Sequence, residues 1–367
     1  MKPAQVFYEP SSLDYELGKR LKEKFADVTW TPIENHNNIE ELRTKENAEF
    51  ANLKRLLIVG TRKTHKYVEN HKVSDYLVPF TSSGCTAMCL YCYLVCNYNK
   101  CSYLRLFVNR EEMLERLIRT SNKLHTGGGT KKNLTDMTDS LPFHSQTEVP
   151  LLKYTANFKN NQDYTFEIGS NSDLILENTI TDNLPWTIES FLRCAKGNLT
   201  FPTKFDMVEP LLPLNHKGRI IFRMSVNPQQ IIRDVELGTA SLKNRIDAIN
   251  RMAEAEYRVG ILIAPVILVE NWKVLYLELF DILETSLSKK MKKQMFIEII
   301  FMTYSYVHQK INSEAFPNAT VLYDKELMTG RGMGKYCYKQ PLRSEGELFI
   351  RDELERRFGT GKILYIS

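Results

Sequence analysis

The cysteines of this chain are concentrated in one short segment. Five of the seven lie in the run "CTAMCLYCYLVCNYNKC" (85–101), and Cys85, Cys89 and Cys92 have the spacing C-x3-C-x2-C. Thiolates so close together can form disulfides, bind zinc or hold an iron–sulfur cluster. The rest of the sequence bears on the choice among these three chemistries.

The composition indicates that these thiols stay reduced. Apolar residues make up 43% and charged residues 25% of the chain, as in an ordinary globular protein. The sequence has no run of about eighteen apolar residues, and its first residues lack the apolar core of a signal peptide. We therefore expect a cytoplasmic protein whose cysteines serve metal or redox chemistry. The net charge of +5 permits a nucleic-acid partner but does not require one.

The cysteine spacing suits a cluster of several irons better than a single zinc ion. A structural zinc site usually joins one close cysteine pair to a second close pair or to histidines, whereas Cys194 and Cys337 stand alone in the sequence. Three thiolates on one loop suit three irons of a [4Fe–4S] cluster, whose fourth iron can then bind a small chelating molecule. Zinc is the alternative.

Strand-like and helix-like segments alternate from about residue 75 onward. The helix-like segments repeat apolar residues every three to four positions, as in "NREEMLERLIRTSNK" (109–123), where Asn109 is placed to cap the helix. This alternation predicts an α/β fold with parallel strands and right-handed crossovers. Six units suit a partial (β/α)6 TIM-type barrel with its chemistry at the carboxyl ends of the strands, and a doubly wound sheet is the alternative. The expected strands are 76–82, 164–170, 198–204, 219–227, 258–268 and 295–302.

The same pattern divides the chain into segments. Residues 1–74 are expected to form an N-terminal α/β extension packed on the barrel, residues 75–320 the barrel, and residues 321–367 a C-terminal region. Residues 124–163 interrupt the alternation with polar residues and three consecutive glycines, which indicates a mobile insertion. A plain surface loop is one interpretation of this insertion, and contact with a polyanion through its lysines is the other.

The cysteine motif resembles that of the radical S-adenosylmethionine enzymes. The resemblance includes the aromatic Tyr91 just before the last cysteine and the position of the motif after the first barrel strand. It implies that Cys85, Cys89 and Cys92 hold a [4Fe–4S] cluster and that S-adenosylmethionine chelates the open iron. In that family, one electron from the cluster cleaves the sulfonium and generates a 5′-deoxyadenosyl radical.

Further runs resemble one family within this group, the spore photoproduct lyases. They span most of the chain in the order found in that family, although the resemblance weakens over residues 1–50 and is lost over 124–163. The main runs are "GTRKTHKY" (60–67), "DYLVPFTSSGCTAMCLYCYL" (75–94), "NSDLILENTI" (171–180), "FPTKFDMVEPLL" (201–212), "RIIFRMSVNPQQII" (219–232), "RVGILIAPVIL" (258–268) and "GRGMGKYCY" (330–338).

The resemblance implies roles for further residues. Tyr91 and Tyr93 would belong to a hydrogen-bonded relay near the reacting base, or would pack over the cluster. The run "MTGRGMGKYCY" (328–338) would be a DNA-lesion-binding hairpin in which Arg331 and Lys335 meet phosphates, with a plain glycine turn as the alternative. A closing helix or strand would follow. The residues expected to line the S-adenosylmethionine site are Ser172, Lys204, Ser225, Asn227 and Ala264.

The implied activity is repair of the thymine dimer formed in spore DNA by ultraviolet light. The adenosyl radical would remove hydrogen from C6 of the dimer, two thymines would form, and the cofactor would be regenerated. Damaged DNA and an electron donor such as a flavodoxin or ferredoxin are the implied partners, in the spore core of a spore-forming bacterium. The alternatives are another radical enzyme acting on a nucleic-acid base, and a non-catalytic zinc-stabilised nucleic-acid-binding protein.

One position departs from the family in a way that matters chemically. The family's hydrogen-donating cysteine lies in a run like E-A-S-C-x-S-D, and Ser170 occupies that place in "EIGSNSD" (167–173). An S–H bond is weak enough to give hydrogen to a carbon radical, whereas an alcohol O–H bond is too strong. We therefore hypothesise that Cys96 or Cys101 supplies the hydrogen, with Cys96 favoured. Otherwise both are incidental buried thiols or extra metal ligands.

Overall fold

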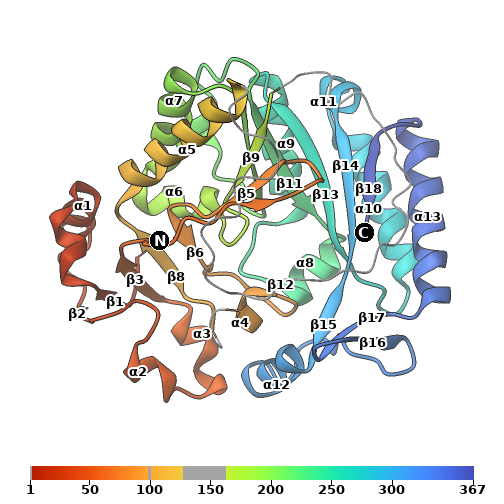
Figure 1. The fold of residues 1–367 in the computed structure, drawn as a ribbon. Coiled ribbons are helices and arrows are strands. Elements are labelled where there is room, and N and C mark those ends of the chain that lie inside the picture. The colour runs from red at the N-terminus through yellow and green to blue at the C-terminus, as the bar shows by residue number, and fades with distance from the viewer. Residues whose placement is uncertain (1, 98–100, 127–162) are drawn as a thin grey trace.

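The computed structural model describes residues 2–97, 101–126 and 163–367, and it is built around one curled sheet of mainly parallel strands (Figure 1). The insertion expected at 124–163 lies almost entirely outside the described residues. The sheet has the strand order β18-β14-β13-β11-β10-β9-β5-β4. Its six central strands are β5 (Tyr76–Val78), β9 (Thr165–Ile168), β10 (Asn198–Thr203), β11 (Ile220–Val226), β13 (Arg258–Val266) and β14 (Phe296–Phe301).

These six parallel strands confirm the expected partial (β/α)6 barrel. Each lies within one of the six apolar runs, and all five pairings between neighbours are parallel. The parallel β18 (Ile363–Ile366) extends the sheet beside β14, and the antiparallel β4 (Val68–Glu69) borders it beside β5. The C-terminal region therefore contributes a strand to the main sheet.

The curl of the sheet is visible in the contacts of one buried arginine. Arg223 on β11 forms ion pairs with Glu298 on β14 at 2.8 Å and with Glu167 on β9 at 2.6 Å. Each of those strands is two places away from β11 in the sheet, on opposite sides. One side chain can reach both only across the concave face, so this polar layer lies inside the half-barrel.

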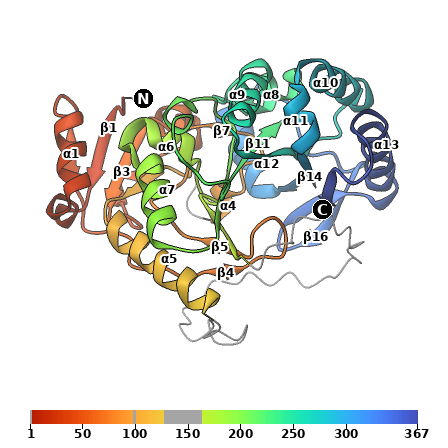
Figure 2. The same cartoon turned by 90° about the horizontal axis from the view of Figure 1, so that it is seen from above.

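Helices cover the outer face of the sheet, as the view from above shows (Figure 2). The segments 109–123, 242–256 and 271–287 are helical, as their periodicity predicts. The longer helices are α5 (Arg110–His125), α6 (Leu174–Thr181), α7 (Asn183–Cys194), α9 (Leu242–Glu254), α10 (Trp272–Ser286) and α13 (Gln340–Phe358); α8 (Gln229–Val235) and α11 (Lys289–Gln294) are shorter.

Asn109 precedes α5 as expected, but its side chain does not cap the helix. The Asn109 amide instead accepts from the backbone N–H of Arg62 at 2.9 Å and donates to the Arg62 carbonyl at 3.0 Å. It also donates to Glu112 at 2.9 Å. The expectation of a side-chain cap was wrong because the Asn109 amide hydrogen-bonds to the backbone of Arg62 instead of to the first N–H groups of the helix.

A second, five-stranded sheet lies beside the barrel, with the order β2-β1-β3-β8-β6. The strands β8 (Leu104–Phe107) and β6 (Ser82–Ser83) come from the cysteine-rich segment and join the three N-terminal strands. The extension is thus continuous with the barrel's first loop. Its remaining elements are β1 (Gln5–Tyr8), α1 (Glu16–Lys24), β2 (Trp30–Pro32), α2 (Glu40–Arg43), α3 (Phe50–Leu53) and β3 (Leu56–Gly60).

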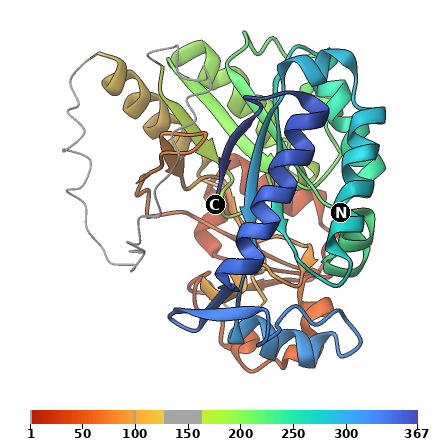
Figure 3. The same ribbon diagram turned by 90° about the vertical axis from the view of Figure 1, so that its right-hand side faces the viewer.

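Short elements gather at the lower end of the barrel in Figure 1, where the parallel strands end. They form a two-stranded sheet of β7 (Met88–Cys89) and β12 (Glu236–Leu237), and a three-stranded sheet of β15 (Thr303–Ser305), β17 (Lys335–Tyr338) and β16 (Met328–Gly332). The helices α4 (Leu94–Asn97) and α12 (Tyr306–Ala315) lie beside them. Figure 3 shows the β16–β17 hairpin projecting from this end. Among the described residues, no helix is long and apolar enough to cross a membrane.

Candidate active site

The three motif cysteines lie on the loop that connects β6 to α4, and all three are half-buried. The loop begins at Gly84, whose φ is +79°. A side chain here would place Cβ 1.8 Å from the Tyr103 carbonyl oxygen, so the close approach of the two segments requires glycine. The backbone N–H of Gly84 donates to Asn171 at 2.8 Å, which ties the loop to the end of β9.

The donor set of this loop fits an iron–sulfur cluster. Burial raises the pKa of the Cys85 thiol to about 12 and raises that of Cys89 as well, so a bound cation is needed to keep these sulfurs as thiolates. Among the described residues, no three His, Cys, Asp or Glu side chains converge on one metal ion. A [4Fe–4S] cluster does not need such convergence, because each thiolate binds a different iron.

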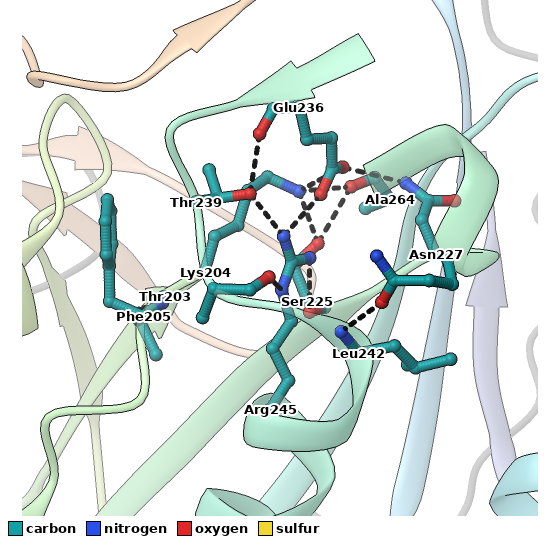
Figure 4. A network of polar contacts seen from close by, with 12 residues as sticks. Thr203, Lys204, Phe205, Ser225, Asn227, Glu236, Thr239, Leu242, Arg245 and Ala264 are labelled. Carbon is teal, nitrogen blue, oxygen red and sulfur yellow. Dashed lines mark hydrogen bonds and ion pairs between the residues drawn. The ribbon is translucent and has the colours of Figure 1, made fainter. Parts of the chain in front are cut away.

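A compact polar cradle lies at the carboxyl ends of β10, β11 and β13 (Figure 4). The ammonium of Lys204, just after β10, donates to Ser225 at 2.5 Å and to the Ala264 carbonyl at 2.9 Å. It also forms an ion pair with Glu236 at 2.9 Å. The fully buried Asn227 amide donates to the same Glu236 oxygen at 2.8 Å. Four of the five residues expected to bind the cofactor are therefore neighbours.

Glu236 is the centre of this cradle, and the sequence reading missed it. Its side chain is fully buried, yet its pKa falls to about 2 because Lys204 and Arg245 together outweigh the cost of burial. Arg245 lies 2.7 Å from its second carboxylate oxygen, as an ion pair rather than an aligned hydrogen bond. No periodicity marks Glu236 in the sequence, since its strand is only two residues long.

Ser172, the fifth expected cofactor residue, follows β9 and lies beside the start of the cysteine loop. Its hydroxyl is 2.5 Å from that of Ser82, which in turn donates to the buried carboxylate of Glu177. The adjacent Asp173, also missed from sequence, accepts the backbone N–H of Lys204 at 2.9 Å. Ser172 is thereby tied both to the start of the cysteine loop and to the strand end that carries Lys204.

Comparisons with known proteins agree with this geometry. The family described as "Spore photoproduct lyase" matches residues 1–124 and 151–367. The chain belongs to the spore photoproduct lyase family. It is 28% identical over 372 residues to spore photoproduct lyase of Bacillus subtilis (strain 168), covering 100% of this chain and 98% of the relative. It is 26% identical over 371 residues to that of Clostridium acetobutylicum, covering 99% and 98%.

Solved structures of the family superpose on the whole chain. Spore photoproduct lyase complexed with dinucleoside spore photoproduct matches with a TM-score of 0.81 and 26% identity, covering 100% of this chain and 99% of the other. A double mutant of the lyase with bound AdoMet and dinucleoside spore photoproduct matches with the same score, identity and coverage. The fold and the radical S-adenosylmethionine cofactor class, with its [4Fe–4S] cluster, are those of the spore photoproduct lyases.

The two tyrosines that flank Cys92 point to different partners. The hydroxyl of Tyr91 donates to Glu236, inside the cradle. The hydroxyl of Tyr93 donates to the backbone carbonyl of Ser170 at 2.5 Å, and the Tyr93 side chain is half exposed. Ser170, the residue expected from the resemblance to stand in place of a donor cysteine, is thus next to Tyr93 and at the mouth of the barrel.

The two additional thiols are in different environments. Cys96 is an exposed residue of α4, but its sulfur is partly buried, 3.3 Å from the Ser305 hydroxyl and 3.6 Å from Nε2 of His308. Cys101 is only 1% exposed and packs with Phe50 and other apolar residues of the N-terminal extension. Cys96 therefore contacts polar side chains of β15 and α12, whereas Cys101 lies in an apolar cluster that also includes Ile311 of α12.

The C-terminal hairpin has the expected position and exposes both of its cations, Arg331 and Lys335. Met333, at the turn between them, is 81% exposed with a φ of +51°. Lys335 pairs with Ser305 in the β15–β17 ladder, so the turn end of the hairpin adjoins Ser305, the neighbour of Cys96. Sequence reasoning found the cations of this hairpin but overlooked its apolar tip.

Proposed function

We propose that this chain repairs the spore photoproduct in DNA, converting the 5-thyminyl-5,6-dihydrothymine dimer to two thymines. The observation that carries the proposal is the match to the family over nearly the whole chain, together with a three-thiolate loop that faces a polar cradle. A [4Fe–4S] cluster and S-adenosylmethionine, when bound, supply a 5′-deoxyadenosyl radical that takes a hydrogen atom from C6 of the lesion and returns one at the end of the cycle.

The residues of the chain have separate roles in this proposal. Cys85, Cys89 and Cys92 bind three irons, which leaves the fourth iron to the methionine group of the cofactor. Lys204 and Arg245 outnumber Glu236 in the cradle by one charge, and this surplus favours the cofactor's carboxylate. Further polar contacts to the cofactor come from Ser172, Ser225, Asn227 and the Ala264 backbone.

Cys96 is the residue that we assign as hydrogen donor. Its S–H bond breaks as a C–H bond forms on the thymine radical. The resulting thiyl radical would take a hydrogen atom back from the methyl group of 5′-deoxyadenosine, which restores the adenosyl radical, so the thiol is unchanged over one cycle. Only the protonated thiol can do this. Burial raises the pKa of Cys96, which keeps the hydrogen on sulfur at neutral pH.

The contacts of Cys96 support this assignment over Cys101. Ser305 and His308 hold the Cys96 thiol between the cysteine loop and the strand that pairs with the hairpin. Cys101 is enclosed by apolar side chains, and its sulfur approaches the Phe50 carbonyl at 3.8 Å. A thiol in that position would need the loop to unfold before it could reach a DNA base.

The three segments of the chain divide the work in this proposal. Residues 75–320 hold the cofactors, residues 1–74 brace the cysteine loop through the five-stranded sheet, and residues 321–367 contact the DNA around the lesion. Arg331 and Lys335 neutralise phosphates, and the exposed Met333 enters the base stack while the lesion is flipped out.

Two further parts of the proposal concern the setting of the reaction. The cluster must receive one electron from outside the protein, and a small carrier of the flavodoxin or ferredoxin type meets that need. The spore core is the compartment in which this lesion forms, so we infer that the protein acts there. Replacement of dithionite by a reduced flavodoxin in the repair assay tests the first inference.

The central test is anaerobic incubation of the reconstituted protein with dinucleoside spore photoproduct, S-adenosylmethionine and dithionite. Thymine formation with less than one equivalent of 5′-deoxyadenosine is expected. Because Ser170 replaces the usual donor, a different radical reaction on a nucleic-acid base is the second candidate. Stoichiometric 5′-deoxyadenosine without thymine would favour that candidate and contradict the repair function.

The donor assignment is tested in the same assay run in D2O. A thiol exchanges its hydrogen with solvent, so wild-type repair should place deuterium in the methyl group of one product thymine. Cys96→Ala should lose this label and accumulate radical adducts, whereas Cys101→Ala should retain it. Clean, deuterated repair by Cys96→Ala would exclude Cys96 as the donor.

A further inference from the structure

The carboxylate of Glu236 joins three parts of the site that are distant in sequence. One of its oxygens receives Lys204 at 2.9 Å, Asn227 at 2.8 Å and the Tyr91 hydroxyl, and the other lies 2.7 Å from Arg245. Figure 4 shows Lys204, Asn227 and Arg245 converging on the carboxylate from several segments of the barrel. The Glu236 side chain is fully buried, so water cannot replace its carboxylate as the partner of these groups.

The backbone of Glu236 makes a second connection. In the β7–β12 ladder, Glu236 pairs with Cys89, one of the three motif cysteines. The N–H of Leu90 donates to the Val235 carbonyl at 2.9 Å, which extends the same attachment. Glu236 is therefore fixed to the cysteine loop by its main chain and by Tyr91, and to the cofactor cradle by its carboxylate.

We propose that Glu236 is a positioning residue that couples the iron–sulfur loop to the cofactor-binding lysine, with Tyr91 as the side-chain link between them. This inference rests on the proposed cofactor site. Glu236 holds the Lys204 ammonium where the carboxylate of S-adenosylmethionine can meet it. Glu236 also holds the cysteine loop, which would carry the iron that binds the methionine group. One side chain therefore positions both parts of the chain that would bind this group of the cofactor.

The same arrangement separates the two tyrosines by role. The O–H of Tyr91 is committed to a buried carboxylate, whereas the O–H of Tyr93 reaches a backbone carbonyl at the exposed mouth. Tyr91 accordingly acts on cofactor binding through Glu236. Tyr93 is left as the tyrosine that can take part in hydrogen transfer near the lesion.

The barrel contains a matched control for this network. Deeper inside the barrel, the Tyr365 hydroxyl donates to Glu298 at 2.6 Å, and Glu298 pairs with Arg223 at 2.8 Å. Glu298 is as buried as Glu236. Among the described residues, the hydrogen bonds and ion pairs of this second tyrosine–glutamate–arginine set do not reach Lys204 or a motif cysteine. Its variants therefore report the cost of breaking a buried ion pair without the proposed coupling.

The experiment measures S-adenosylmethionine binding to the anaerobically reconstituted protein by equilibrium dialysis. It also follows the change that the cofactor causes in the electron paramagnetic resonance spectrum of the reduced cluster. Glu236→Gln should weaken binding about tenfold or more and shift this spectrum, while iron content stays at the wild-type level. Tyr91→Phe should weaken binding by a smaller factor, and the double variant should bind no worse than Glu236→Gln alone. Glu298→Gln and Tyr365→Phe should lower the melting temperature but leave cofactor binding unchanged.

Two results would overturn the inference. One is wild-type cofactor affinity in Glu236→Gln, and the other is additive losses in the Tyr91→Phe/Glu236→Gln double variant. If Glu236→Gln fails to bind iron, Tyr91→Phe alone decides the outcome, because it keeps both ion pairs and removes only one hydroxyl. None of these measurements requires repair activity, so a failure of the proposed repair reaction is seen separately, as absence of thymine from the wild-type assay.

Discussion

The hydroxyl of Tyr93 lies 2.5 Å from the carbonyl oxygen of Ser170, so the tyrosine after the last motif cysteine is next to the serine that the resemblance places where a donor thiol is expected. Ser170 itself is half-buried at the end of β9. The structure therefore places position 170 beside Tyr93 at the mouth of the barrel.

The place of residue 170 beside Tyr93 leads to a rescue prediction. Ser170→Cys in a Cys96→Ala background should restore clean thymine formation, because a thiol at position 170 would again lie beside Tyr93. Product analysis by mass spectrometry after repair of the dinucleoside lesion measures this. Ser170→Ala in the same background is the control and should leave the radical adducts in place. Equal repair by both double variants would show that position 170 has no part in hydrogen return.

The cluster ligands give a prediction about iron. Replacement of Cys85, Cys89 or Cys92 by alanine should remove most of the iron and the brown absorbance, because three thiolates are the minimum that the motif provides. Cys101→Ala, at a buried thiol outside the motif, should bind iron as the wild type does. Iron and sulfide analysis after anaerobic reconstitution decides this, and a Cys89→Ala protein with full iron content would contradict the assignment.

The hairpin tip gives a prediction that separates substrates. Met333→Ala should slow repair of the lesion in duplex DNA about tenfold and leave repair of the dinucleoside lesion unchanged, since only the duplex has a base stack to open. Arg331→Ala should also make the slope of log binding constant against log salt concentration shallower, by about the amount that one phosphate contact contributes. Val68→Ala, at a half-exposed apolar residue on the edge strand β4, is the control. An equal loss of repair rate on both substrates would show that Met333 has no part in opening the DNA.

The thiol of Cys96 gives a prediction about pH. Burial raises its pKa above the ordinary value for cysteine, so the protonated form that donates hydrogen persists to higher pH than in a free thiol. Deuterium incorporation per repaired dimer should therefore stay constant from pH 7 through the ordinary thiol pKa, about 8.5, and fall only above it. A fall in deuterium incorporation beginning near pH 7.5 would mean that burial does not raise the pKa of the Cys96 thiol.

The buried ion pairs of Arg223 give a prediction about stability. Arg223→Leu leaves Glu167 and Glu298 facing each other inside the barrel without a counter-charge. The free energy of unfolding should fall by about 3–5 kcal/mol, as is usual when one partner of a buried pair is removed. Urea denaturation measures this.

The sequence alone determined the strands, the outer helices and the cluster loop. Apolar runs bounded by polar residues predicted all six central strands, because a parallel strand covered on both faces must be apolar along its length. The cysteine spacing and the local runs predicted the family, since those residues are contiguous in the chain. The cap on α5 was predicted incorrectly because the competing partner, Arg62, lies 47 residues away.

The tertiary structure decided which side chains meet. Glu236 meets Tyr91 and Lys204, which are 145 and 32 residues away, and Asp173 meets the backbone of Lys204 beside the cradle, 31 residues away. No local pattern encodes such contacts. It also separated Cys96 from Cys101, which are five positions apart but belong to a solvent-facing helix and an apolar core. Burial and partner choice depend on the packing of whole elements, so they become visible only once those elements are placed in space.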